Sequence, residues 1–239
     1  MSEAKDEIII RHYRPEDREV VRRICCDTGF LGNPVDPVFQ DRELFADYLT
    51  GYYLDEAPEL AVILEKNGEV RGYILCGNDP QAQAAYERSH APGWAWRAIT
   101  GYFFRYGAGT KKYIHWILTK GRKEVPFTPK GMAHFHINLL SDVRSMDGTR
   151  KMFDFFFHDL KQKGIHSIYG QVVTFEERRS AAMFKRYGFL LQDKMEVTKF
   201  QHMVDHSVFL FTVTKDLTHF TGMYDYKSEV KSDEVRTKK

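Results

Sequence analysis

The chain has 239 residues, of which 43% are hydrophobic and 28% are charged, and its formal net charge is +2. These values are typical of a globular protein with one sizeable core, and the near-neutral charge gives no case for nucleic-acid binding by the whole chain. No apolar run approaches the ~18 residues of a membrane span, and the charged first residues do not form a secretory signal. The three cysteines have no metal-ligand spacing and form no even disulfide set. We therefore expect a cytoplasmic protein without a membrane span or a metal site.

The first 80 residues predict a strand, two helices and a hairpin. Proline is tolerated in the first turn of a helix, so Pro15 is expected to open the first helix. The dipeptide Asn67-Gly68 between two apolar runs is typical of a two-residue hairpin turn. The expected elements are a strand at residues 7–12, a helix after Pro15, a helix at residues 41–53, and hairpin strands at residues 60–65 and 70–76.

Residues 82–130 interrupt this order with a segment rich in aromatic and basic side chains. Between Arg97 and Lys130 there are eight basic residues and one acid, Glu124, which gives eight minus one, or +7. We interpret the segment as a mostly helical insertion that serves as a lid or a docking surface. In the alternative interpretation it is a solvated helix whose aromatic rings face the core.

Residues 133–189 carry the most informative pattern in the chain. A strand at residues 133–140 leads through a turn at residues 144–149 into an amphipathic helix. A second strand at residues 166–173 is followed by a short helix that ends in Gly188-Phe189. Where a strand leads directly into a helix, the N-terminus of the helix presents free N–H groups and the positive end of the helix dipole. This arrangement predicts an anion-binding turn.

The end of the chain predicts two further strands and a tail. The strands are expected at residues 194–201 and 207–215. From Met223 onward the sequence is charged and repetitive, which predicts disorder.

This order of elements resembles the GCN5-related N-acetyltransferases (GNAT) over residues 1–222. The resemblance implies an α/β fold, in which helices flank a central mixed, mostly antiparallel sheet, and a single domain with residues 82–130 as a helical insertion. Because the insertion lies between the hairpin and the strand at residue 133, its ends are expected at the same end of the sheet, and we expect it to border the acceptor. The sequence of residues 22–30 and the Ala-His-x-His-Ile strand at residues 133–137 are similar to those of one branch of this family. This branch contains the bacterial proteins related to the acetyltransferase-like domain of O-GlcNAcase. Acetyl-CoA is then the expected co-substrate.

The anion-binding turn of the family has the pattern Gln/Arg-x-x-Gly-x-Gly/Ala, in which glycines let the backbone approach a pyrophosphate. It maps onto Arg144, Asp147 and Thr149, so Asp147 replaces a glycine and Gly148 stands one position late. We expect the Asp147 carboxylate to cap the helix and to weaken or block coenzyme A binding through like charge. The alternative for this turn is a self-capped helix without a phosphate site. The resemblance implies that coenzyme A is held by Leu139, Leu140, Arg144, Ser145, Asp147, Gly148, Thr149 and Arg150, the first two through N–H groups at the thioester.

The helix before Gly188 departs from the family pattern Asn-x-x-Ala-x-x-Phe-Tyr. Glu177 replaces the asparagine of the pattern, Ser180 replaces the alanine, and Phe184 replaces the tyrosine. The family tyrosine often acts as a general acid, and Phe184 has no proton to give. Tyr187 lies almost one turn further on, and we do not expect it to substitute.

A candidate general base lies on the strand at residues 133–140. His134, His136 and Asn138 share one face because side chains alternate along a strand. His136 is the candidate catalytic base, since the unperturbed pKa of histidine suits proton transfer near neutral pH. The alternative is a hydrogen-bonded, half-buried histidine with no catalytic role.

Three functional hypotheses follow. In the first, the chain transfers an acetyl group from acetyl-CoA to a small-molecule or peptide amine, and the strand after Phe135 separates from its neighbour to pair with pantetheine. In the second, the chain is a non-catalytic fold relative that binds a partner or ligand, because Asp147, Phe184 and Glu177 all depart from the pattern. In the third, the basic insertion binds nucleic acid or anionic lipid; it ranks last because no binding motif is present, and nucleic acid is not an expected partner. A homodimer is one expected assembly.

Overall fold

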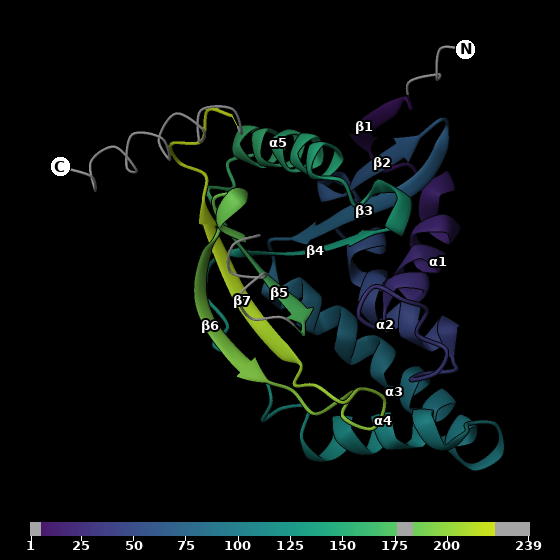
Figure 1. Ribbon diagram of the computed structural model, residues 1–239. Coiled ribbons are helices and arrows are strands. Elements are labelled where there is room, and N and C mark those ends of the chain that lie inside the picture. The colour runs from purple at the N-terminus through teal and green to yellow at the C-terminus, as the bar shows by residue number, and fades with distance from the viewer. Residues whose placement is uncertain (1–5, 176–183, 223–239) are drawn as a thin grey trace.

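A computed structural model of the chain describes residues 6–175 and 184–222. Its centre is one seven-stranded sheet with the order β1-β2-β3-β4-β5-β7-β6 (Figure 1). All neighbours in the sheet are antiparallel except β4 and β5, which are parallel. The strands are β1 (Ile8–His12), β2 (Val62–Lys66), β3 (Glu69–Gly77), β4 (Ala133–Leu139), β5 (Ser167–Thr174), β6 (Leu190–Glu196) and β7 (Phe209–Asp216).

The expected mixed, mostly antiparallel sheet is confirmed, and β4 lies at its centre with three strands on either side. The β2–β3 hairpin has the predicted turn, in which Asn67 and Gly68 have φ values of 53° and 80°. Two positive φ values in a row match the turn that suits the twist of a hairpin. The first of the two C-terminal strands was placed about four residues late by the sequence, because β6 already ends at Glu196.

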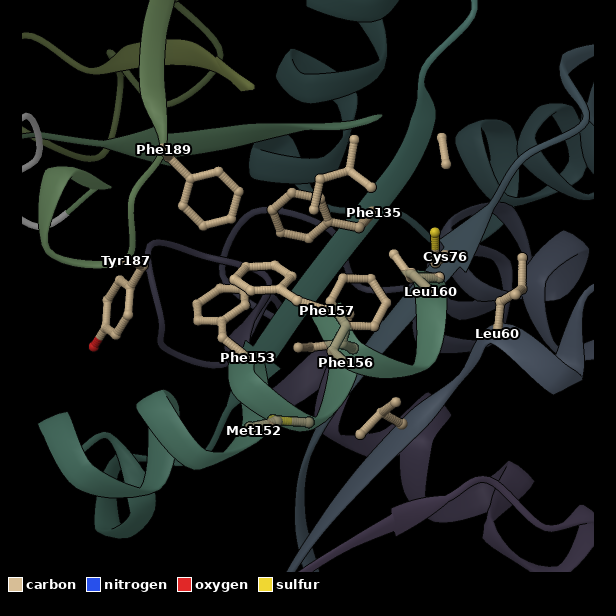
Figure 2. Packing of buried hydrophobic residues seen from close by; sticks show 14 of the residues in the cluster. Leu60, Cys76, Phe135, Met152, Phe153, Phe156, Phe157, Leu160, Tyr187 and Phe189 are labelled. Carbon is tan, nitrogen blue, oxygen red and sulfur yellow. The ribbon is translucent and has the colours of Figure 1, made fainter. Parts of the chain in front are cut away.

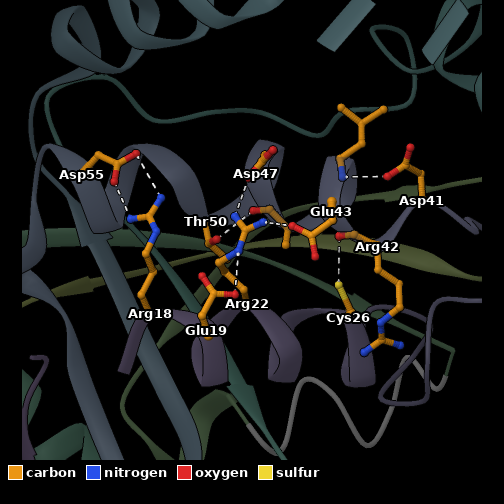
Figure 3. A network of polar contacts seen from close by, with 12 residues as sticks. Arg18, Glu19, Arg22, Cys26, Asp41, Arg42, Glu43, Asp47, Thr50 and Asp55 are labelled. Atoms are coloured by element: carbon orange, nitrogen blue, oxygen red, sulfur yellow. Dashed lines mark hydrogen bonds and ion pairs between the residues drawn. The ribbon is translucent and has the colours of Figure 1, made fainter. Parts of the chain in front are cut away.

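The helices α1 (Arg18–Thr28) and α2 (Arg42–Asp55) cover one face of the sheet. Apolar side chains of both helices pack on Ile63, Tyr73 and Leu75, which point to the same side of β2 and β3. Ion pairs join the outer surfaces of the two helices: Arg22 lies 2.5 Å from both Asp47 and Glu43 (Figure 3).

The helix α5 (Met146–Gln162) covers the opposite face. Its inner side carries Phe153, Phe156 and Phe157, which are buried against Phe135 of β4 and Phe189 (Figure 2). Such a cluster of aromatic rings stabilises the fold mainly through the apolar area it removes from water. The sheet is therefore a central layer between two helical layers.

The predicted insertion is helical and consists mainly of α3 (Pro80–Phe104) and α4 (Ala108–Thr119). Trp94, Ala98, Tyr113 and Ile114 pack against a buried cluster formed by α1, α2 and the segment between them. The insertion is also tied to this segment through the buried carboxylate of Asp41, which accepts hydrogen bonds from the side chains of Arg97 and Tyr106.

None of the helices in the described part of the chain combines the length and the apolarity of a membrane span. Glu177, Ser180 and the predicted disordered tail lie outside the described residues.

Candidate active site

The sheet opens between β4 and β5. The two parallel strands are paired at three positions, from Ala133 opposite Ile168 to Phe135 opposite Gly170. Beyond Phe135, β4 stays paired with β3 up to Leu139, and β5 stays paired with β7 along its whole length. The two strands therefore part after Phe135, as the acetyltransferase hypothesis implied, and each turns an edge toward the opening.

The direction of the backbone groups on β4 follows from one hydrogen bond. The N–H of Leu140 donates to the carbonyl of Arg71 at 2.9 Å, so it points toward β3. Because N–H groups alternate in direction along an antiparallel strand, those of Ile137 and Leu139 point toward the opening. Leu139 is thus oriented as a backbone donor at the opening, whereas the N–H of Leu140 is used by the β3–β4 ladder.

The turn after β4 brings the N-terminus of α5 to the same end of this strand. The helix begins at Met146, and its cap is Ser145, whose hydroxyl accepts a hydrogen bond of 3.1 Å from the N–H of Gly148. The prediction that Asp147 caps the helix is therefore wrong: Ser145 directly precedes the first helical residue, whereas Asp147 is the second residue inside the helix. The exposed Asp147 carboxylate instead pairs with Lys151 at 2.9 Å.

Capping by Ser145 leaves the electrostatics of the turn less hostile to an anion than capping by a carboxylate would. The N–H of Gly148 donates its hydrogen bond to a neutral hydroxyl rather than to a carboxylate. Breaking a hydrogen bond to a hydroxyl costs less free energy than breaking one to a carboxylate, so Ser145 can rotate away more easily. Asp147 still carries a negative charge in the first turn, where Lys151 partly offsets it. A pyrophosphate that approached this turn would therefore meet a long-range repulsion that salt screens, rather than a carboxylate bound to the same N–H groups.

The other predicted phosphate ligands are dispersed. Arg144 donates from Nε to the carbonyl of Leu139 at 2.8 Å and from its terminal nitrogen to the carbonyl of Gly32 at 2.7 Å, so it fastens the turn to the segment after α1. The half-buried Thr149 donates its N–H to the carbonyl of Ser145 at 3.2 Å, as helix geometry requires. Arg150 lines a shallow groove of about 570 Å³ between β1 and α5, away from the β4–β5 opening.

His136 belongs to a hydrogen-bonded chain of three side chains. The hydroxyl of Tyr53, on α2, lies 3.1 Å from Nε2 of His136 and 2.9 Å from Nδ1 of His134. One hydroxyl carries one proton, so it donates to one imidazole and accepts from the other. The tautomers of the two histidines are thus linked. Asn138, the third polar residue on this face of β4, donates to the hydroxyl of Thr28.

Burial keeps this chain uncharged. It lowers the pKa of His136 to about 4. It lowers the pKa of His134 well below the ordinary value, and the neighbouring His136 adds to this effect. Burial also raises the pKa of Tyr53. The three groups are neutral at pH 7, and Nε2 of His134 is buried without a hydrogen-bond partner among the described residues.

Tyr53 could not be recognised as a site residue from the sequence. It lies 81 positions before His134 on a helix with no distinguishing motif. The buried ring of Phe184 packs with Phe211, and that of Tyr187 packs against Phe153 of α5 (Figure 2). Both rings are part of the core below the sheet.

The fold has counterparts among solved structures. SsHAT is 23% identical, with a TM-score of 0.57 over 89% of this chain and 99% of its own. An N-acetyltransferase from Staphylococcus aureus Mu50 is 14% identical, with a TM-score of 0.52 over 89% of this chain and 99% of its own. The Salmonella typhimurium protein yncA, a putative acetyltransferase whose structure holds acetyl-CoA, is 14% identical, with a TM-score of 0.50 over 90% of this chain and 96% of its own. The chain has the fold of GNAT acetyltransferases. No protein-family model and no curated protein matched its sequence.

Proposed function

We propose that the chain is an N-acetyltransferase that uses acetyl-CoA as its acyl donor. The observation that carries the proposal is the opening between β4 and β5, where the sheet turns the N–H groups of Ile137 and Leu139 toward a gap. An unpaired strand edge is a template for an extended amide-containing ligand, because backbone hydrogen bonds can continue along it. The pantetheine arm of coenzyme A has the required amides, and the N-terminus of α5 stands nearby for its phosphates.

The residues at the opening suit acetyl transfer. Amide groups of the donor would pair with the β4 edge, and the N–H of Leu139 would stabilise the negative charge that develops on the thioester oxygen. Attack of the amine forms the new C–N bond, and the C–S bond then breaks to release the thiolate. The reaction needs chiefly the correct placement of amine and thioester, which a rigid central strand provides.

Proton transfer from the attacking amine is assigned to His136, with Tyr53 as its positioning residue. His136 lies on β4 one position before Ile137, and its Nε2 contacts the Tyr53 hydroxyl. Burial lowers the pKa of His136 to about 4, so the imidazole is neutral and has a free lone pair, but it is a weaker base than the ordinary histidine that the sequence suggested. Because the buried Phe184 has no proton to give, the thiolate would take the second proton of the attacking ammonium, or a proton from water, after His136 has taken the first.

The acceptor is proposed to be a small-molecule or peptide amine that enters beside the insertion. Tyr113 of α4 packs in the same apolar cluster as Val173 of β5, and its ring stacks on Phe200 of the β6–β7 connection. These contacts support a position of the insertion near the open end of β5. We further propose that residues 1–222 form one domain and that the chain belongs to the branch related to the acetyltransferase-like domain of O-GlcNAcase. A homodimer is the proposed assembly. The proposed location is the cytoplasm, because the three cysteines are buried free thiols.

Calorimetric titration with acetyl-CoA and coenzyme A, followed by thiol-release assays on a panel of amines, tests the proposal. We expect saturable binding of both nucleotides and thiol release that depends on the amine. His136→Gln should lower kcat at least tenfold, within the range typical of general-base loss. His158→Gln, on the outer side of α5, is the matched control and should leave kcat unchanged.

The competing function is a non-catalytic binding protein with the same fold. The tethered guanidinium of Arg144 and the negative charge of Asp147 favour it, because both reduce the attraction of the turn for a pyrophosphate. Binding of coenzyme A without thiol release by any amine would support this alternative, and absence of binding would remove the acetyltransferase proposal.

A further inference from the structure

The insertion exposes an unusually apolar outer face. On α3 the side chains of Trp96, Phe103 and Phe104 are 70%, 71% and 83% exposed, and on α4 that of Leu118 is 79% exposed. Ile99 of α3 and Ile117 of α4 are also exposed, at 53% and 46%. We call these six residues the aromatic face. Large exposed apolar groups on neighbouring elements mark an interaction surface, whereas isolated ones are common on any protein.

The opposite sides of α3 and α4 pack against the core and attach the insertion to the rest of the protein. Trp94 and Ala98 of α3 and Tyr113 of α4 pack toward the core, and Asp41 anchors Arg97. The aromatic face is therefore not needed to hold α3 and α4 on the protein. In Figure 1, α4 and the end of α3 lie at the end of the molecule opposite α5.

The charge of this segment indicates which partner fits the aromatic face. From Arg88 to Lys123 there are eight basic residues and no acidic residue, so the remainder of the chain has a net charge of 2 − 8, or −6. Lys112, Lys120 and Lys123 are exposed. A second copy of the chain, bound face to face by twofold symmetry, would bring two such basic segments together and repel.

We propose that the aromatic face binds the surface of an anionic phospholipid membrane. Aromatic and aliphatic side chains flanked by lysine and arginine are the combination that lies in the interface of a bilayer, with apolar groups among the acyl chains and cations at the headgroups. The acidic remainder of the chain would be repelled by the same surface, which orients the protein with α3 and α4 toward the membrane. The proposal is independent of acetyl transfer.

Cosedimentation with phosphatidylcholine vesicles, with and without phosphatidylglycerol, tests the proposal. We expect binding that requires phosphatidylglycerol, weakens with added salt, and shifts the emission of Trp96 to shorter wavelength, a shift lost in Trp96→Phe. The double variant Phe103→Ser/Phe104→Ser should bind at least about tenfold more weakly, since each buried aromatic ring contributes more than ~1.4 kcal/mol. Arg122→Glu/Lys123→Glu should weaken binding and reduce its salt dependence.

Leu190→Ser is the matched control, because Leu190 is an exposed apolar residue on β6, outside the insertion. It should leave vesicle binding unchanged. Equal binding by the Phe103/Phe104 variant, or no binding to anionic vesicles at low salt, would overturn the proposal. So would binding to oligonucleotides in place of vesicles, or a dimer in sedimentation velocity that the Phe103/Phe104 variant abolishes.

Discussion

The hydroxyl of Tyr53 lies 3.1 Å from Nε2 of His136, so a side chain of α2 contacts the polar face of the central strand β4. The same hydroxyl lies 2.9 Å from His134, which stacks on Tyr169 of the neighbouring strand β5. Buried polar groups are costly unless they are hydrogen-bonded, so this chain of contacts fixes both imidazole rings beside the β4–β5 opening. Substitution of Tyr53 therefore perturbs both histidines without changing a residue of β4.

Tyr53→Phe should destabilise the protein by about 1–3 kcal/mol, because two imidazole nitrogens lose their common partner. Urea unfolding measures the loss, and kcat for thiol release should fall with a shifted pH profile. Tyr52→Phe is the control. Tyr52 is also a buried tyrosine of α2, but its hydroxyl donates to the carbonyl of Asp79 instead. An equal effect on the pH profile in both variants would contradict a specific link between Tyr53 and His136.

Stability should fall as the pH is lowered from about 6.5 to 4. The pKa of His136 is about 4 in the folded protein and close to 6.5 in the unfolded chain. Between these values the unfolded chain binds more protons, so the free energy of unfolding decreases with falling pH. At about 1.4 kcal/mol per pKa unit the loss from His136 is at most ~3 kcal/mol. Unfolding at several pH values should show this slope, and His136→Gln should reduce it; an unchanged slope would contradict the lowered pKa.

Asp147→Asn should strengthen coenzyme A binding several-fold. The substitution removes a negative charge from the first turn of α5 and keeps the size of the side chain, and one exposed charge contributes ~1 kcal/mol. The gain should shrink at high salt. Stability should change by less than ~1 kcal/mol, because Ser145 rather than Asp147 caps the helix. Asp154→Asn, further along α5, is the control for calorimetry. Equal coenzyme A affinities of the wild type, Asp147→Asn and Asp154→Asn would show that the phosphates do not bind at the N-terminus of α5.

Asp41→Asn should loosen the insertion. The nearly buried Asp41 carboxylate accepts hydrogen bonds from Arg97 and Tyr106 and caps α2 through the N–H of Leu44. Asparagine keeps the cap but loses the charge-assisted bonds, which should reduce stability by about 1.5–3 kcal/mol. Hydrogen exchange should rise in α3 and α4. Asp36→Asn removes an exposed carboxylate paired with Arg42 and should change stability by less than ~1 kcal/mol.

The sequence predicts the strand at residues 133–140 and the β2–β3 hairpin because these depend on local patterns, whereas the mixed sheet and the opening after Phe135 were implied by the resemblance to acetyltransferases. Alternation along residues 133–140 and the turn residues Asn67-Gly68 each reflect nearest neighbours in the chain. The cap of α5 could not be assigned in the same way, because Ser145 and Asp147 are both good capping residues two positions apart. Only the position at which the backbone becomes helical decides between them.

The network around His136 could not be predicted, for a different reason. Tyr53 and His136 are 83 residues apart and meet only because α2 crosses β4 on the face of the sheet opposite α5. A pattern in the chain reveals which face of β4 is polar, but not which side chain of a distant helix reaches it. The same limit applies to Arg144, whose partner Gly32 lies in the segment after α1.

Amide chemical shifts during an acetyl-CoA titration show whether the β4–β5 opening holds the acyl donor. We expect saturable shifts at Ile137, Leu139 and the first turn of α5, since these N–H groups would face the pantetheine arm or the phosphates. The amide of Leu140, which is bonded to Arg71, should shift less than that of Leu139. Absence of shifts at saturating acetyl-CoA, or shifts confined to residues away from the β4–β5 opening, would contradict binding of acetyl-CoA at this opening.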